Sequence, residues 1–231
     1  MGEISIDPKF NIHETYKKVR ILNPYRNQTG SLPIYFAKIS HYLDAAVGVT
    51  KTQGAVTSWV DKKNSNDWVN YLAPANLGNG VDANGSFVSF HSNNSGLTFP
   101  QSMNDNKEVV IVMKRFAHSF NNYFIGGVEN LNAFVYDSTN GGYYDAITRN
   151  IDTPTIHKNI GTSDLAVFNM SYISTGFDVN SAILGIRENG AFAANAHYYE
   201  VIFFSEALTV SERSALYVDL KNKYPAISNL P

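Results

Sequence analysis

The clearest pattern of apolar and polar positions lies near the C-terminus, where a continuous apolar run is followed by a helical period. Tyr198 to Phe204 is an uninterrupted run dominated by aromatic and β-branched side chains, which predicts a buried strand. Leu216, Leu220 and Tyr224 then recur every four residues, so they share one face of a helix. We therefore expect a strand that leads through a turn into a closing helix from about Val210 to Lys223.

Both ends of this helix carry their own signals. Thr209 is followed three residues later by Glu212, which is the spacing of a capping box. In that motif the threonine hydroxyl accepts from the backbone N–H of Glu212, and the carboxylate accepts from the backbone N–H of Thr209. Pro225 stands where the helix should end. We expect the helix to bury Leu216 and Leu220.

Between these elements and the N-terminus, the apolar positions come in short runs that Gly, Asn, Asp or Pro clusters separate. The segment from Ile34 to Asp44 fits a short helix or a strand. The predicted strands are Ala55–Val60, Ser86–Phe90, Val109–Arg115, Asn122–Ile125, Ala133–Tyr136, Ala166–Ile173 and Ser181–Ile186. Their spacing favours an antiparallel β-sandwich over a parallel sheet of β-α-β units.

Residues 1–30 differ from the rest and are predicted to form an extended arm, while residues 31–231 form one domain. A loose alternation of apolar side chains precedes a basic stretch. We expect these residues to dock on a partner chain, with the apolar ones as anchors and the basic ones against an acidic rim: Ile4, Ile6, Phe10, Ile12, Lys17, Lys18 and Arg20. The alternative is an ordinary edge strand on the domain's own sheet.

Composition narrows the classes of partner. The chain of 231 residues has a net charge of −2, which predicts no sequence-independent attraction to nucleic acid or to anionic membranes. It has no Cys, which excludes disulfides and cysteine metal sites. No apolar run approaches the roughly 18 residues of a membrane span, and the N-terminus lacks the apolar core of a secretory signal.

Four segments in register resemble the concanavalin A-like lectin/glucanase superfamily, the laminin-G-like jelly rolls. His41–Thr50 (HYLDAAVGVT), Gly54–Asp67 (GAVTSWVDKKNSND) and Asn84–Pro100 (NGSFVSFHSNNSGLTFP) are similar to three family segments in the same order. The C-terminal match comprises Glu200, Val201, Phe203, Leu208, Ser211, Glu212, Arg213, Leu216, Leu220, Lys223 and Tyr224. The resemblance implies an all-β, two-sheet antiparallel jelly-roll sandwich with a short C-terminal helix, and it places Trp59 inside the sandwich. His91 and Ser92 stand where the family often has Asp-Gly.

No enzymatic activity is expected. Glycoside hydrolases of this superfamily carry two carboxylates on one strand, two or four residues apart, so that both point to the same face. None of the glutamates has an acidic residue two positions on; after Glu200 these positions hold Ile202 and Phe204. We expect Glu200 to hydrogen-bond backbone or a loop. The six histidines show no zinc-binding spacing, so no catalytic or metal residue is predicted.

Calcium is common in lectins and in laminin-G-like domains, and its ligands there are oxygens of Asp, Asn and backbone carbonyl groups. Met103–Glu108 and Val135–Gly142 offer some oxygens, but neither has the spacing of an EF-hand. Such clusters more often form turns. No cofactor is therefore expected, and calcium is left open.

The best candidate for a ligand-binding face is a glycine-rich segment in the second half of the chain. A lectin site joins Asp and Asn groups, which bond sugar hydroxyls, to an aromatic ring that stacks on the sugar. Asp137, Asn140, Tyr143 and Tyr144 provide these groups. The alternative is a hairpin turn whose tyrosines pack on the sheet or on a neighbouring subunit.

Taken together, these features predict a non-catalytic structural or recognition module of a virus particle: a bacteriophage head-decoration, tail or fibre protein with a virion location. Its expected partners are other virion proteins or further copies of the chain, bound through the arm, and in some cases a glycan. The alternative is a lectin-like adhesin or accessory module at a cell surface or outside the cell. A glycoside hydrolase is disfavoured by the missing carboxylate pair.

Overall fold

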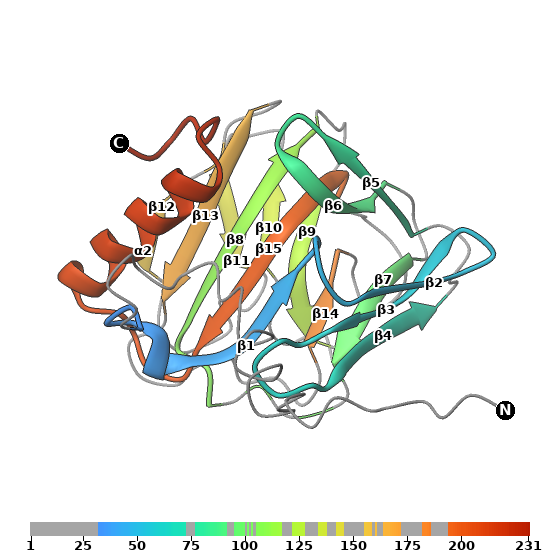
Figure 1. The fold of residues 1–231 in the computed structure, drawn as a ribbon, viewed down its shortest axis with the longest axis horizontal. Helices are drawn as coiled ribbons and strands as arrows, with labels where there is room; N and C mark the ends of the chain where they lie inside the picture. The colour runs from blue at the N-terminus through green and yellow to red at the C-terminus, as the bar shows by residue number, and fades with distance from the viewer. Residues whose placement is uncertain are drawn as a thin grey trace, which may run out of the picture.

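The computed structural model describes residues 32–72, 77–91, 95–99, 101, 103, 105–116, 122–127, 134–137, 142–145, 155–158, 160, 164–171, 182–185 and 194–231. These residues form a two-sheet antiparallel sandwich with one helix, α2 (Val210–Lys223), near the C-terminus (Figure 1). The predicted all-β fold class is confirmed. The predicted arm, with its seven docking residues, lies outside the described residues.

The first sheet, here called sheet A, has seven described strands. Its order is β12 (Thr155–Lys158), β13 (Leu165–Ser171), β8 (Glu108–Arg115), β15 (Ala196–Phe204), β6 (Gly85–Phe90) and β5 (Gly78–Asp82), and β1 (Ile39–Asp44) also pairs with β15. The strands β6 and β1 follow one another along the same edge of β15, because β6 pairs with its first residues and β1 with its last ones.

The second sheet, sheet B, has eight described strands. Its order is β11 (Gly142–Asp145), β10 (Phe134–Asp137), β9 (Asn122–Gly127), β14 (Ala182–Leu184), β7 (Ser95–Phe99), β4 (Asp67–Leu72), β3 (Ala55–Val60) and β2 (Val49–Thr52). The predicted strand Ala55–Val60 coincides with β3. The ambiguous segment before Asp44 contains both elements, a short 3-10 helix, η1 (Phe36–Lys38), followed directly by β1.

The space between the sheets is filled by large apolar side chains. Trp68 of β4 stacks on Phe99 and on Phe203, with ring centroids 5.3 and 5.8 Å apart. Trp59 of β3 faces the same core and is fully buried, which confirms its expected place inside the sandwich. The register pairs Trp59 with Trp68, so the two indoles come from directly opposed positions.

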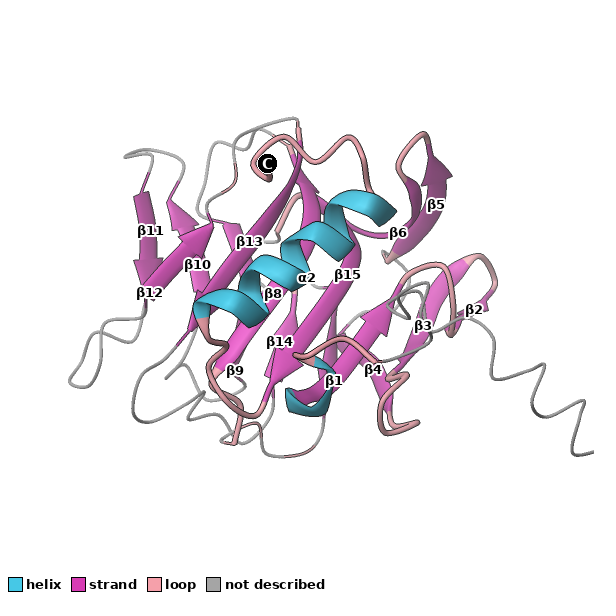
Figure 2. Ribbon diagram, turned by 60° about the vertical axis from the view of Figure 1, so that its left-hand side comes forward, coloured by secondary structure: helices cyan, strands magenta, loops and turns pink. Residues whose placement is uncertain are grey.

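A second apolar core lies on the outer face of sheet A, where α2 packs across the sheet (Figure 2). Leu216 and Leu220 are fully buried there, as predicted, against Val110, Val167 and Ile202. Because successive strand residues point to opposite faces, β8 contributes alternately to the two cores. This explains why β8 is apolar at every position from Val109 to Met113, as is typical of a strand buried on both sides.

The start of α2 confirms the predicted capping box. The hydroxyl of Thr209 accepts a hydrogen bond from the backbone N–H of Glu212 at 3.3 Å, and the Glu212 carboxylate accepts from the Thr209 N–H at 2.7 Å. Residues 224–231 then return along the sheet, and Asn229 bonds both backbone groups of Val167 on β13. No helix in the described part of the chain has the length and apolarity needed to cross a membrane.

Candidate functional site

The outer face of sheet A has two regions with different surroundings. The covered half lies beneath α2 and is lined by Val110, Val112, Val167, Ile202 and Phe204. The open half lies farther along β6, β15 and β8, where the side chains are half-buried or exposed: Phe87, His91, Lys114, Phe116 and His197. The strand register places Ser89, His197 and Lys114 in one row across these three strands.

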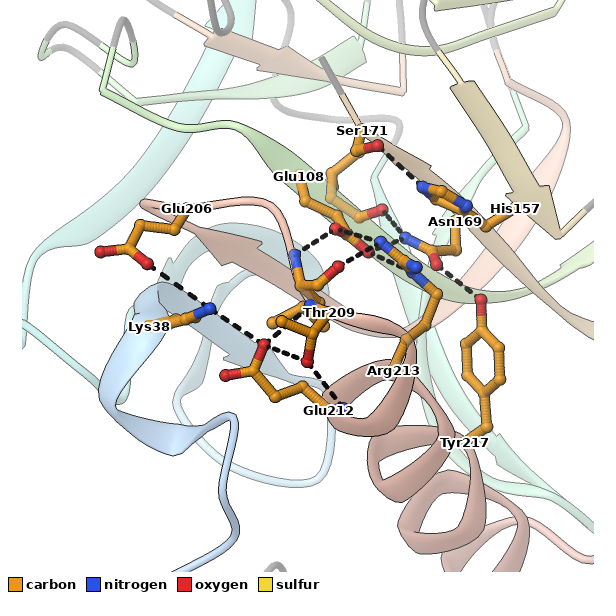
Figure 3. A network of polar contacts seen from close by, with 12 residues as sticks. Lys38, Glu108, His157, Asn169, Ser171, Glu206, Thr209, Glu212, Arg213 and Tyr217 are labelled. Carbon is orange, nitrogen blue, oxygen red and sulfur yellow. Dashed lines mark hydrogen bonds and ion pairs between the residues drawn. The ribbon is translucent and has the colours of Figure 1, made fainter. Parts of the chain in front are cut away.

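The covered half holds a fully buried carboxylate, Glu108, beside the first turn of α2 (Figure 3). Arg213 donates two hydrogen bonds to it, from Nε at 2.9 Å and from Nη2 at 2.8 Å. The backbone N–H of Leu208 and the amide of Asn169 donate two more, at 2.7 and 2.8 Å. Four donors therefore satisfy this carboxylate, and its role is to fasten the helix to β8.

Further polar contacts extend this network along the helix (Figure 3). The hydroxyl of Tyr217 donates to the Asn169 side-chain oxygen at 2.6 Å, and His157 Nε2 lies 2.7 Å from the hydroxyl oxygen of Ser171. Burial, together with the positive charge of Arg213, lowers the pKa of His157. The network joins β8, β12, β13 and α2, so it stabilises the arrangement of these elements.

A second buried network fastens the other end of α2. Asp44 of β1 and Glu200 of β15 are register partners, and the ammonium of Lys223 lies 3.1 Å from the first carboxylate and 2.9 Å from the second. Lys62 reaches Asp44 at 3.2 Å, and the hydroxyl of Tyr42 hydrogen-bonds Glu200. The expectation that Glu200 bonds backbone or a loop is wrong, since charged and phenolic side chains surround it.

Two carboxylates on neighbouring strands are the groups that a glycoside hydrolase requires, but the surroundings of this pair do not suit that role. The side chains of Asp44 and Glu200 are 4% and 0% exposed, which leaves no access for a sugar. Burial acts to raise the pKa of Asp44, but the ammonium groups of Lys223 and Lys62 outweigh it and lower the pKa. The pair is a buried ionic contact that holds β1, β15 and α2 together.

The open half is built around the imidazole of His197. Its ring stacks on Phe87, with centroids 3.6 Å apart and an interplanar angle of 8°. Phe116 and His91 approach the same ring edge-on, at 4.8 and 5.0 Å. The four rings come from β6, β15 and the end of β8, and together they form a partly exposed aromatic platform.

Polar groups border this platform near the ends of β6 and β8 and the start of β15. The ammonium of Lys114 lies 5.8 Å from the centroid of Phe116, and within the described part of the chain it forms no ion pair. His91 Nδ1 is 2.8 Å from the side-chain oxygen of Asn195. The buried Nδ1 atom of His197 has no hydrogen-bond partner among the described residues.

A carboxylate borders the platform at its β5 end. Asp82, at the end of β5, accepts hydrogen bonds from the hydroxyl of Tyr199 at 2.7 Å and from the backbone N–H of Asn84 at 2.8 Å. Burial acts to raise the pKa of Asp82, but these hydrogen bonds outweigh it and lower the pKa. Asp82 therefore stays ionised and offers acceptor oxygens beside the rings.

The surroundings of His197 keep its imidazole neutral. Burial is the main cause and His91 the next, with Lys114 adding to them and Asp82 opposing them; together they lower the pKa of His197 to about 4. The ring therefore carries no charge near neutral pH and acts as a flat stacking partner for Phe87. It remains able to donate one hydrogen bond and to accept another.

The predicted ligand-binding residues lie on the other sheet. Asp137 is the last residue of β10, and Tyr143 and Tyr144 belong to β11, with which β10 forms an antiparallel pair at the edge of sheet B. Asn140 and the side chains of the other three lie outside what the structure describes. Their role in binding stays a prediction, and they do not belong to the platform on sheet A.

Sequence reasoning missed the open half because its residues are far apart along the chain. One signal was available: Phe87, Ser89 and His91 alternate at a strand period, and His91 stands where the resembling family often has Asp.

The segment Met103–Glu108, considered above for calcium, contains a turn. The Asn106 side-chain amide donates a hydrogen bond to the Met103 carbonyl at 3.0 Å and so stabilises this turn. Among the described residues no group of three or more His, Cys, Asp or Glu is placed to hold a metal.

Comparison with known proteins shows similarity at the level of three-dimensional structure. No family model matches the sequence, and no curated protein matches it. Trypanosoma rangeli sialidase matches with a TM-score of 0.55 and 13% identity, over 91% of this chain and 38% of the sialidase. The same enzyme in complex with sialic acid matches with a TM-score of 0.56 and 14% identity, over the same shares.

A mutant of the Trypanosoma rangeli sialidase that displays trans-sialidase activity matches in the same way, with a TM-score of 0.54 and 14% identity. This chain spans 38% of the length of these enzymes, and identities this low show a shared fold alone. The comparison overturns the prediction of a non-catalytic structural module of a virus particle, because the matching solved structures are sialidases. What the chain shares with these sialidases is the fold, a β-sandwich of two antiparallel sheets.

Proposed function

We propose that this domain binds glycans through the open half of sheet A, as part of a glycan-processing protein. The observation that carries the proposal is the aromatic platform of Phe87, His197, Phe116 and His91, which remains partly exposed on an otherwise covered sheet face. A pyranose ring presents C–H groups on its faces and hydroxyls around its rim. Aromatic rings with polar groups at their border match both features.

The polar border has the right chemistry for sugar hydroxyls. The Asp82 carboxylate accepts hydrogen bonds at the β5 end of the border, and His91, Asn195 and Lys114 provide donors and acceptors elsewhere along it. These groups are positioned by backbone that is itself held in the sheet, since the Phe116 N–H bonds the Asn195 carbonyl at 2.9 Å. A site built in this way needs little reordering when a ligand binds.

The fold supports the proposal without deciding it. The sialidases that share this sandwich act on glycans, and one of them is complexed with sialic acid. The Asp44–Glu200 pair of carboxylates is buried and bonded to lysine. The proposal therefore assigns recognition of the sugar, and no bond cleavage, to the open half.

The test is a glycan array probed with the full chain, followed by titration of the best binders. Phe116→Ala removes one edge of the platform, and its half-buried ring contributes stacking worth about two- to tenfold in affinity. Val218→Ala is the matched control, because Val218 is 56% exposed on α2. Thermal melts of each variant establish that it is folded.

Two results would contradict the proposal. The first is the absence of any glycan binder for the folded chain. The second is binding that survives both Phe116→Ala and His91→Ala unchanged. If Tyr143→Ala or Tyr144→Ala abolishes binding instead, the site lies at the β10–β11 hairpin that the sequence predicted.

A further inference from the structure

Lys114 differs from three lysines that contact sheet A or its helix through acidic partners. Lys38, Lys62 and Lys223 each form ion pairs, with Glu206 and Glu212, with Asp44, and with Asp44 and Glu200 respectively. Lys114 is half-buried, and its ammonium faces Phe116 without an acidic partner among the described residues. Its positive charge is therefore available to a ligand on the platform.

We infer that the open half selects acidic sugars, whose carboxylate binds the ammonium of Lys114 while the sugar ring stacks on the platform. This inference rests on the proposed function, because it names the class of glycan that the same site takes. Uronic acids and sialic acids share the required chemistry, a carboxylate attached directly to a pyranose ring.

The charges around the platform give such a ligand one orientation. Lys114 lies on β8, on one side of His197, whereas Asp82 lies at the end of β5, on the side of β6 that is remote from β15. Both charges act on the His197 imidazole, with opposite signs. An acidic sugar placed with its carboxylate toward Lys114 keeps that group away from Asp82 and turns hydroxyls toward the Asp82 oxygens.

Other charged groups nearby do not alter this arrangement. The neighbouring Arg115 is buried and points to the opposite face of the sheet, because it alternates with Lys114 along β8. Asp82 is held by Tyr199 and Asn84, so it is not free to swing across and neutralise the lysine. His197 adds no charge near neutral pH.

The test compares two ligands that differ only at one carbon. Methyl β-glucuronide carries a carboxylate where methyl β-glucoside carries a hydroxymethyl group, and binding of each to the full chain is measured by NMR titration. We expect the glucuronide to bind about two- to fivefold more tightly at low salt, the gain of one partly exposed charge pair. The preference should shrink in higher salt, because exposed charges are screened.

Lys114→Met tests the assignment to this residue. Methionine retains an unbranched apolar chain but carries no charge, so glucuronide should lose more affinity than glucoside and the ratio of the two affinities should fall to about one. Lys51→Met is the control, since Lys51 is exposed on β2 of the other sheet. N-Acetylneuraminic acid, titrated in parallel, shows whether sialic or uronic acids fit better.

Three outcomes separate this inference from the proposed function. Equal affinity for glucuronide and glucoside, with both weakened by Phe116→Ala, overturns the acidic preference but leaves glycan binding in place. An acidic preference that persists in Lys114→Met overturns the assignment to Lys114. Failure of all three sugars to bind, together with an empty glycan array, overturns both proposals.

Discussion

The covered and open halves of sheet A lie on the same face of the sheet and share β8 and β15, yet the environments of their charged groups are opposite. Under α2, Glu108 accepts four hydrogen bonds, and Asp44 and Glu200 share one ammonium. In the open half the Lys114 charge has no acidic partner among the described residues. A buried charge is tolerated only when it is paired, whereas a charge at the surface carries no such requirement.

The strand β8 carries one charged residue from each half, Glu108 in the covered half and Lys114 in the open half, six positions apart. Glu108 and Lys114 are both on its outer side, because they are separated by an even number of positions. Glu108 lies where the start of α2 covers the sheet and is fully buried; Lys114 lies beyond the helix and is half-buried. Position relative to α2 therefore decides whether a polar side chain on this face stabilises the fold or remains available to a ligand.

The largest effect is expected where a buried charge loses its partner. Arg213→Leu leaves Glu108 buried with only neutral donors, and we expect a loss of about 3–5 kcal/mol in the free energy of unfolding. The measurement is chemical denaturation. Lys114→Met, the corresponding change in the open half, should stay within about 0.5 kcal/mol of the wild type. Similar losses for both variants would show that the two halves do not differ as described.

A somewhat smaller effect is expected from the apolar part of the covered half. Leu220→Ala should lower the free energy of unfolding by about 2–4 kcal/mol, because it leaves a cavity between α2 and sheet A. Val218→Ala on the same helix is the control, and as an exposed position it should change stability by less than about 0.5 kcal/mol. An unchanged denaturation midpoint for Leu220→Ala would contradict the packing of α2 on the sheet.

The smallest expected effect is on the pH dependence of the free energy of unfolding, to which His197 in the open half contributes. The pKa of His197 is about 4 in the folded protein and about 6.5 when unfolded, so the unfolded chain binds the proton first as pH falls. The stability that comes from neutral His197 is complete above pH 6.5 and is lost progressively toward pH 4. His197→Phe preserves a ring against Phe87 but does not titrate, so its melting temperature should fall less over this range.

The pKa of His157 is lowered as well, so His157 also makes stability depend on pH. This contribution is present in both the wild type and His197→Phe, since the substitution leaves His157 in place. The difference between the wild-type and His197→Phe melting curves is therefore the quantity to follow, measured by circular dichroism at several pH values. Identical pH profiles for the two proteins would show that His197 does not titrate in the environment described here.

Local signals explain why the C-terminal strand and helix were predictable. The apolar run of β15, the Thr209–Glu212 capping box and the four-residue spacing of Leu216 and Leu220 all act within a few residues of one another. Several short strands were not predictable by the same means. The strand β5 contains a single apolar side chain, Val81, and it exists because its backbone pairs with β6.

The contacts between the site residues, like the short strands, could not be predicted from local signals in the sequence. The sequence determined the alternation of β8, and with it the set of its side chains that share an outer face, whereas β15 has an irregularity between Tyr198 and Glu200 that its sequence does not mark. Only the tertiary structure decided that Asp44 meets Glu200, that Arg213 meets Glu108, and that His197 lies between Phe87 and Phe116. These contacts join elements that are far apart along the chain, and their chemistry depends on where α2 covers the sheet and excludes water from it.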